Sequence, residues 1–220
     1  MSLGRVRLDL FVDDKKVDDD RVVGSTLAEA LRDVQVHCCP PPRILVGFRC
    51  DGAEVAAAAM ASTLSRPAGS FELLEVFTST REELVADAMN QASASLEEAE
   101  GVTQNVAELL MEGKSADGIA RLGECLRDWQ QIHDAVVKSL GLLRLDPAQV
   151  MVRDEPMLAA LEKPKDVLLQ IKRALQAQDH VLLADILQFE FAEVTDLWHT
   201  LIARIRQEAD DLRAASGGVI

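Results

Sequence analysis

The chain has 220 residues, of which 48% are hydrophobic and 27% are charged, a composition typical of globular proteins and too apolar for a disordered one. Its length allows one large domain or two small ones. Against 37 acidic side chains stand 23 basic ones, so the formal net charge of −14 disfavours nucleic acids and anionic membranes as partners.

Residues up to about Thr78 show the short, alternating patterns of β-strands. Apolar residues at every second position predict a first strand, formed around Val6, Leu8, Leu10 and Val12. The polar run 13–16 predicts a turn, after which 17–23 is expected to return as the second strand of a hairpin.

A helix is expected next, because Thr26 and Glu29 have the spacing of a capping box. In this motif each side chain binds a free backbone N–H of the first helical turn. The proline run 40–42 ends the helix. Its apolar face consists of Leu27, Leu31, Val34 and Cys38.

The strands that follow complete a sheet. A third strand is predicted from the alternation of Ile44, Val46, Phe48 and Cys50, and Asp51-Gly52 predicts a turn after it. A last apolar strand is expected over 71–77. Over about residues 4–78 this order resembles the β-grasp (ubiquitin-like) fold, in which a hairpin is followed by one helix packed across a mixed sheet. Sulfur carriers with that fold end in a Gly-Gly tail activated at its carboxylate; here the chain continues into a helix at Ser79, so that chemistry is not expected.

From Thr80 onward the apolar period changes to that of helices. Thr80 and Glu83 form a second capping box, which begins a long helix expected to stop at Gly113. Further helices are expected over 115–143, over 165–176 and from about 179 onward. The segment 182–185 together with Trp198 resembles bacterial proteins that have no assigned activity.

Pro156 and Pro164 are expected to interrupt any longer helix in the region before 165. The predicted fold class is therefore α+β. A small N-terminal β-grasp-like ββαββ module over 1–78 precedes an all-α up-and-down bundle over 79–220, with three long helices and one shorter helix.

The helix over 115–143 carries a coiled-coil-like seam, because its apolar positions are spaced alternately by three and four residues. These positions are Ile119, Leu122, Leu126, Trp129, His133, Val136, Leu140 and Leu143. His133 is either a buried, register-setting or pH-sensitive group, or it lies at the edge of the core with Ile132 in its place. We favour the second interpretation. The candidate interaction or switch residues are His133, Trp129 and Trp198.

Acids on the last helix have the chemistry of metal ligands. The nearest match to the Glu-x-x-His pattern of carboxylate di-metal sites is formed by Glu190, Glu193, Asp196 and His199. No second copy of the pattern appears in the sequence. Solvated acids on an outer helix face are the favoured interpretation, so no metal site is predicted.

Soft ligands for zinc occur near the first helix, and they are His37, Cys38, Cys39 and Cys50. No C-x-x-C spacing exists, and Cys38 and Cys50 are expected on apolar faces, where cysteine behaves as a small hydrophobe. Reduced core thiols are the favoured interpretation. No cofactor is predicted.

Catalytic signatures are not found in the sequence. Gly113-Lys114-Ser115 resembles the end of a phosphate-binding P-loop, but Glu108 stands where that loop needs a glycine. G-x-S-x-G, H-E-x-x-H and a Rossmann glycine turn are all missing. The aspartates among 13–20 lack the alternating pattern of a calcium loop. We therefore expect that the protein is not an enzyme.

The start of the chain has no apolar stretch of the signal-peptide kind, and four cysteines are too few for a disulfide framework. A cytoplasmic protein is therefore expected. The segment 79–220 holds 25 of the acidic and 14 of the basic side chains, so the acidity belongs to the helices. We expect a non-enzymatic interaction or adaptor protein with a protein partner or self-association, and no nucleic acid or membrane. The alternative is a metal-binding protein or carboxylate-metal enzyme that uses the bundle acids with His199 or His133.

Overall fold

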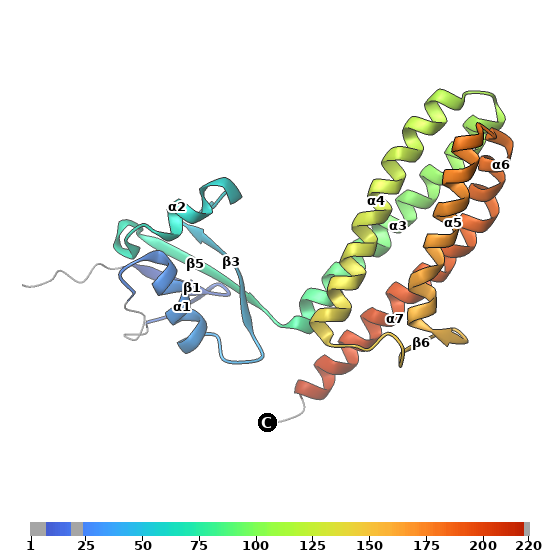
Figure 1. The fold of residues 1–220 in the computed structure, drawn as a ribbon. Coiled ribbons are helices and arrows are strands. Elements are labelled where there is room, and N and C mark those ends of the chain that lie inside the picture. The colour runs from blue at the N-terminus through green and yellow to red at the C-terminus, as the bar shows by residue number, and fades with distance from the viewer. Residues whose placement is uncertain (1–7, 19–23, 218–220) are drawn as a thin grey trace, which may run out of the picture. The chain divides into compact units, whose positions relative to one another are not determined.

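The computed structural model describes residues 8–18 and 24–217. It is 69% helical, and a small N-terminal mixed sheet is followed by helices, so the predicted α+β class is confirmed (Figure 1). The chain groups into two compact units, Met1–Arg81 and Glu82–Ile220, which we call the sheet unit and the helical unit. None of the described helices is both long and apolar enough to span a membrane.

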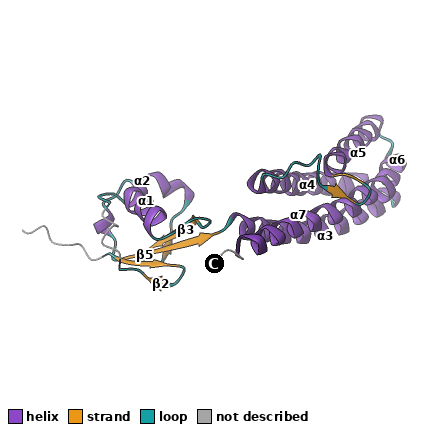
Figure 2. Ribbon diagram, turned by 90° about the horizontal axis from the view of Figure 1, so that it is seen from below, coloured by secondary structure: helices purple, strands orange, loops and turns teal. Residues whose placement is uncertain are grey.

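The sheet unit contains a five-stranded sheet in the order β2-β1-β5-β3-β4 (Figure 2). Its strands are β1 (Asp9–Val12), β2 (Lys15–Lys16), β3 (Ile44–Cys50), β4 (Ala53–Glu54) and β5 (Leu73–Ser79). The central pair, β1 and β5, runs parallel, whereas β1 with β2, β3 with β4 and β3 with β5 are antiparallel. A hairpin, one helix and a mixed sheet are the features expected from the β-grasp resemblance, and the fold has all three.

Helix α1 (Leu27–His37) begins with the predicted capping box. The backbone N–H of Glu29 donates to Thr26 Oγ1 at 3.3 Å, and Glu29 Oε2 accepts the backbone N–H of Thr26 at 3.1 Å. The buried face of the helix joins Leu74 and Val76 of β5 in the core of this unit. Short helical turns form the connector to β5, and they are η1 (Ala57–Ala59), α2 (Met60–Leu64) and η2 (Ala68–Ser70).

The first hairpin is tighter than the sequence pattern predicts. Asp13 and Asp14 have φ values of 48° and 62°, which are typical of the two-residue turn that matches the twist of paired strands. The returning strand is therefore Lys15–Lys16, directly after the turn. The prediction of a strand over 17–23 is wrong in the part that the structure describes, because residues 17 and 18 belong to no strand. The rest of that segment and Val6 lie outside the described residues.

Strand β3 departs from strict alternation. Its pairing with β5 shifts between Leu45 and Gly47, as in a β-bulge, where one extra residue changes the face on which the next side chain lies. Val46 is consequently 45% exposed, while Leu45 and Phe48 pack against the core. The prediction that alternate residues of this strand face the core is therefore confirmed at Phe48 and Cys50 and wrong at Val46.

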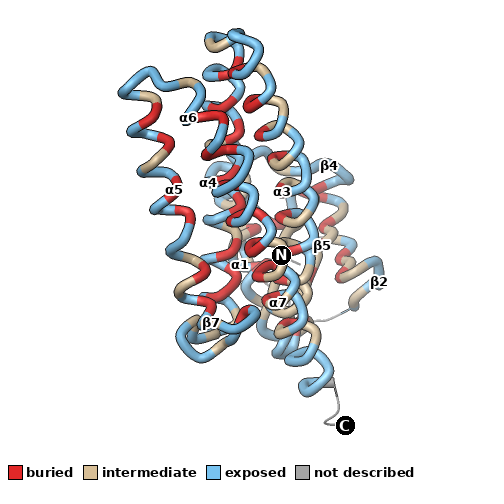
Figure 3. Tube along the Cα trace, turned by 90° about the vertical axis from the view of Figure 1, so that its right-hand side faces the viewer, coloured by how far each residue is buried: buried red, intermediate tan, exposed pale blue. Residues whose placement is uncertain are grey.

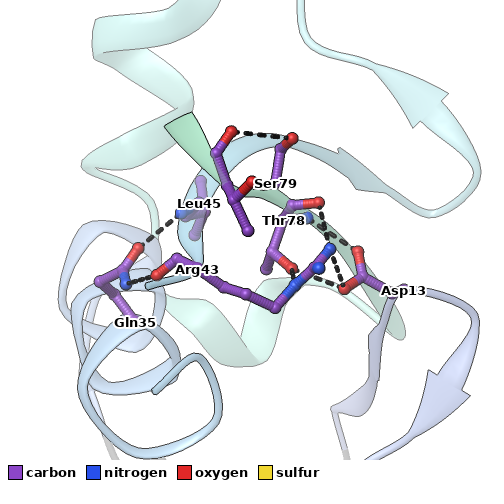
Figure 4. Close-up of polar contacts among 7 residues, drawn as sticks. Asp13, Gln35, Arg43, Leu45, Thr78 and Ser79 are labelled. Carbon is purple, nitrogen blue, oxygen red and sulfur yellow. Dashed lines mark hydrogen bonds and ion pairs between the residues drawn. The ribbon is translucent and has the colours of Figure 1, made fainter. Parts of the chain in front are cut away.

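The carboxylate of Asp13 ties the first hairpin to β5 (Figure 4). Its Oδ1 accepts the backbone N–H of Thr78 at 2.8 Å, and its Oδ2 accepts the Thr78 hydroxyl at 2.5 Å and the Arg43 guanidinium at 3.2 Å. The backbone carbonyl of Arg43 in turn accepts a hydrogen bond from Gln35 of α1 at 3.2 Å. Burial alone would raise the pKa of the Asp13 carboxyl, but the hydrogen bonds from Thr78 and the charge of Arg43 outweigh it and lower the pKa.

Asp13→Asn is expected to destabilise the sheet unit by about 1 kcal/mol at neutral pH and to have little effect in acid. A lowered folded-state pKa means that the carboxylate stabilises the fold above its unfolded pKa, and that this stability is lost as pH falls through the folded pKa. The side chain is 37% exposed, so solvent screens the interaction and limits the effect. Urea unfolding followed by the NMR signals of Val76, at neutral pH and at roughly pH 2, measures both values. An equal cost at the two pH values would contradict this assignment.

The helical unit is a bundle with its buried residues along the facing sides of the helices (Figure 3). Its helices are α3 (Arg81–Met111), α4 (Ser115–Leu143), α5 (Met157–Ala177), α6 (His180–Asp185) and α7 (Phe191–Gly217). A π-helical turn, η3 (Ile186–Glu190), joins α6 to α7, and a small hairpin of β6 (Met151–Val152) and β7 (Glu155–Pro156) precedes α5. The predicted bundle of three long helices and a shorter one is confirmed, with α5 as the shorter one. It is longer than expected, because it begins at Met157 and not at Lys165.

The buried stripe of α4 differs from the predicted seam. It consists of Leu122, Cys125, Trp129, Ile132, Val136 and Leu140. Cys125 takes the place expected for Leu126, and Ile132 takes that of His133, which lies at the edge as the favoured interpretation expects. The Cys125 Sγ lies 3.3 Å from Thr103 Oγ1 of α3. Cys125 therefore contacts α3, whereas Trp129 of the same stripe packs against Phe191 and Trp198 of α7.

Candidate functional site

Helices α4 and α5 both pack on α7 and leave a groove between them, which we call the α4–α5 groove. Its volume is about 550 Å³, within the range of known ligand sites. It is lined from α4 by Leu126, Trp129, Gln130 and His133, from α5 by Leu161, Pro164, Lys165, Leu168, Leu169 and Lys172, and from α7 by Phe191 and Trp198.

Three aromatic rings, those of Trp129, Phe191 and Trp198, form the floor of the groove. The ring centroid of Trp129 lies 5.0 Å from that of Phe191 and 5.2 Å from that of Trp198, with interplanar angles of 58° and 60°. Tilted and edge-to-face pairs of this kind are favoured by the charge distribution of aromatic rings. His133 stacks on Trp198 at 5.7 Å and 26°. The floor is therefore a packed cluster of aromatic rings that are almost fully buried, with one half-exposed imidazole at its edge.

Pro164 lies inside α5, so the expectation that it interrupts the helix is wrong. A proline has no N–H to donate to the carbonyl four residues earlier, which here belongs to Ala160. The indole N–H of Trp198 donates to that carbonyl instead, at 3.2 Å. The buried carbonyl is thus satisfied from α7, which lets α5 continue through the proline.

The π-helical turn directly precedes Phe191. The backbone N–H of Phe191 donates to the carbonyl of Ile186, five residues earlier, so one extra residue is accommodated in this turn. The carbonyl of Phe191 accepts the hydroxyl of Thr195 at 2.9 Å. Such turns often occur at functional sites, and this one lies where α7 enters the groove.

The rim of the groove is apolar and basic. On α5, Leu168 and Leu169 are 42% and 43% exposed, and Lys165 and Lys172 are exposed beside them. No acidic residue of the described chain lines the groove. Residues 79–220 nevertheless hold 25 acidic and 14 basic side chains. The groove is therefore a local departure from an acidic surface.

Of the residues singled out in the sequence, Trp129, Trp198 and His133 meet in this groove. The side chain of His133 is 46% exposed there. The α5 side of the groove was not among the residues predicted from the sequence. Lys165 and Lys172, seven positions apart on either side of two leucines, gave no distinctive signal, because exposed lysines are common on helix surfaces.

The acids of the metal hypothesis lie in a different cleft, between α5 and α7. Glu190 accepts a hydrogen bond from α5, Asp196 forms a 2.6 Å ion pair with Arg153, and Glu193 is exposed. His199 instead lies 3.7 Å from a carboxylate of α3. Nine positions separate Glu190 from His199, or about two and a half helical turns, so the two residues lie on opposite sides. No group of three side chains that could hold a metal occurs among residues 8–18 and 24–217.

The residues of the zinc hypothesis have different environments. Cys39 and Cys50 are buried in the core of the sheet unit, and burial raises the pKa of both thiols, which opposes the thiolate form that zinc binds. Cys38 was expected on the buried face of α1, but it is the half-buried residue at the end of the helix. His37 is exposed. The three cysteines therefore belong to or pack against the core of the sheet unit.

A family model described as Domain of unknown function (DUF8042) matches residues 87–201. This is more than half of the chain, and the chain belongs to this family. Every residue that lines the α4–α5 groove lies within the matched segment. No curated protein and no solved structure matches the chain.

Proposed function

We propose that the chain is a non-enzymatic interaction or adaptor protein, which binds an apolar segment of a protein partner in the α4–α5 groove. The observation that carries the proposal is the apolar lining of this groove that solvent can reach, which consists of the half-buried Leu126 and Leu161 and the exposed Leu168 and Leu169. Apolar surface that is gathered in one concave patch on a protein typically marks a binding site.

The sheet unit offers less to a partner. Its edge strands are β2 and β4, and each of them has two residues. Short edges give an added strand few backbone hydrogen bonds, so they disfavour strand addition. The helical unit is therefore the binding part in this proposal.

The compartment that we propose is the cytoplasm, because Cys39, Cys50 and Cys125 are buried free thiols and cytosolic proteins keep their thiols reduced. The alternative function, metal binding or carboxylate-metal catalysis, gains no support from the geometry. His133 stacks on Trp198 in the groove, and His199 lies apart from Glu190.

Partner capture with cross-linking in cells tests the proposal. Leu168→Glu combined with Leu169→Glu places two charges on the rim, and we expect it to reduce recovery of the partner at least tenfold. The physical reason is that burial of two half-exposed leucines contributes about 2 kcal/mol to binding. Leu158→Glu is the matched control, because Leu158 is 44% exposed on the same helix but does not line the groove.

The proposal is contradicted if the wild-type chain recovers no partner, or if all three proteins recover the same partner equally. Unchanged tryptophan fluorescence and circular dichroism of the purified variants would show that the substitutions leave the fold intact. Since both substituted leucines are exposed, we expect little loss of stability.

A further inference from the structure

The α4–α5 groove is elongated. On α5 its lining extends from Leu161 to Lys172, a rise of about 16 Å, and on α4 from Leu126 to His133, about 10 Å. Both helices pack against α7 (Figure 1), and the residues that line the groove come from all three helices. An occupant that follows the groove is therefore long and narrow. An amphipathic helix of two to three turns, with apolar residues at i, i+3, i+4 and i+7, has this form.

The charge of the rim selects among such helices. Lys165 and Lys172 lie two helical turns apart on α5, a separation of about 10 Å along the axis. Both are exposed, and neither forms an ion pair with an acidic residue in the described part of the chain. They flank Leu168 and Leu169, which are the apolar contacts of the same rim. An occupant with carboxylates two turns apart would therefore pair with both lysines while its apolar face enters the groove.

A second copy of the chain fits this rim poorly. In a twofold dimer the groove of one copy would face the groove of the other, so the lysines at positions 165 and 172 of both copies would come close together. No acidic residue of the described chain lines the groove to compensate their positive charge. Nucleic acids and anionic membranes are disfavoured by the acidic excess of residues 79–220. Charge complementarity therefore favours a different protein that carries acidic side chains.

We infer that the occupant of the α4–α5 groove is an acidic, amphipathic helix of a different protein. Its apolar residues contact the leucines that line the groove above the buried aromatic rings, and two of its carboxylates, two turns apart, pair with Lys165 and Lys172. The inference rests on the proposed function, because it specifies the kind of segment that the groove binds.

The tryptophans provide a direct readout. The chain has two tryptophans and no tyrosine, and both tryptophans line the groove. The probe is a synthetic helical peptide of about 18 residues without aromatic side chains, with leucines on one face and two glutamates seven positions apart beside them. A matched peptide has glutamine at those two positions. At low salt we expect the glutamate peptide to bind roughly tenfold more tightly, and we expect this preference to shrink at high salt.

Charge reversal assigns the preference to the two lysines. Lys165→Glu combined with Lys172→Glu should abolish or reverse the preference for the glutamate peptide. Arg127→Glu combined with Lys138→Glu is the matched control, because it makes the same change in net charge at two exposed positions of α4 that do not line the groove. This control protein should keep the preference.

Each other outcome overturns the inference in a distinguishable way. If both peptides bind with equal affinity, the occupant has no acidic preference and the inference is wrong. The proposed function still stands in that case if the protein with Leu168→Glu and Leu169→Glu binds neither peptide. No fluorescence response to either peptide overturns the inference, and partner capture then decides the proposed function separately. If dodecanoate gives a saturable fluorescence response and neither peptide does, the inference is overturned in favour of a small amphiphile as the occupant. A dimer in sedimentation that Leu168→Glu dissociates overturns it in favour of a second copy.

Discussion

Replacing Trp198 with phenylalanine is expected to lower the free energy of unfolding of the helical unit by about 3 kcal/mol. Part of this loss arises because a smaller ring leaves a cavity at a site that is fully buried. The rest arises at the carbonyl of Ala160, which accepts the indole N–H at 3.2 Å and would lose its donor. A buried carbonyl without a donor costs about 1–3 kcal/mol.

Pro164→Ala in the same chain separates the two contributions. Alanine at this position supplies an N–H to the carbonyl of Ala160, so the indole donor is no longer needed. The cost of Trp198→Phe should therefore be smaller by about 1 kcal/mol in this background. Urea unfolding of the four proteins, followed by tryptophan fluorescence and by circular dichroism, measures this coupling.

Leu201→Val is the control for this cycle, because Leu201 is a fully buried residue of α7 that does not line the groove. Its cost should be the same with proline or alanine at position 164. An equal cost of Trp198→Phe in the two backgrounds would show that the indole does not replace the missing backbone donor.

Local signals in the sequence predict most of the elements of this fold. The capping box of Thr26 and Glu29 and the turn at Asp51 and Gly52, with φ values of 51° and 76°, are present where the sequence predicts them. The hydrogen bonds of the capping box join residues three positions apart, and the two-residue turn depends on the backbone conformation of Asp51 and Gly52 themselves. The long helices are predictable for the same reason, since their period and their ends depend on neighbouring positions.

Contacts between distant residues decide the features that the sequence does not predict. The helix through Pro164 depends on a donor from Trp198, which lies 34 positions later. The buried stripe of α4 passes through Cys125 and not Leu126, because Thr103 of α3 faces that side. The bulge that exposes Val46 depends on the pairing of β3 with β5. Propensity and periodicity contain no information about these partners.

The residues of the candidate site also divide into those with a local signal in the sequence and those that depend on distant contacts. Trp129, His133 and Trp198 stand out in the sequence, because large aromatic rings and an imidazole occur among aliphatic positions of helices. Their meeting in one groove depends on how α4 and α5 are spaced on α7, which is a property of helix packing. Lys165 and Lys172 gain significance only after the groove is known, since surface lysines are common.

Gly24→Ala is expected to destabilise the sheet unit by about 3 kcal/mol or more. A methyl group on Gly24 would lie 2.2 Å from the backbone nitrogen of Ala30 and 2.5 Å from the carbonyl carbon of Glu29. These atoms belong to the first part of α1, which cannot move aside without breaking the capping box of Thr26. Amide exchange in α1 and alkylation of the buried Cys50 thiol should each become faster by about two orders of magnitude.

Ser25→Ala is the matched control, because Ser25 is the next residue and is exposed, so both measured rates should stay at their wild-type values. Unchanged rates in Gly24→Ala would contradict the close approach of Gly24 to α1.

The Gly24→Ala variant also tests which of the two units binds the partner. The α4–α5 groove is formed entirely by the helical unit, so Gly24→Ala should leave the fluorescence response to the glutamate peptide unchanged. Loss of that response in a chain whose helical unit is still folded would mean that the sheet unit takes part in binding.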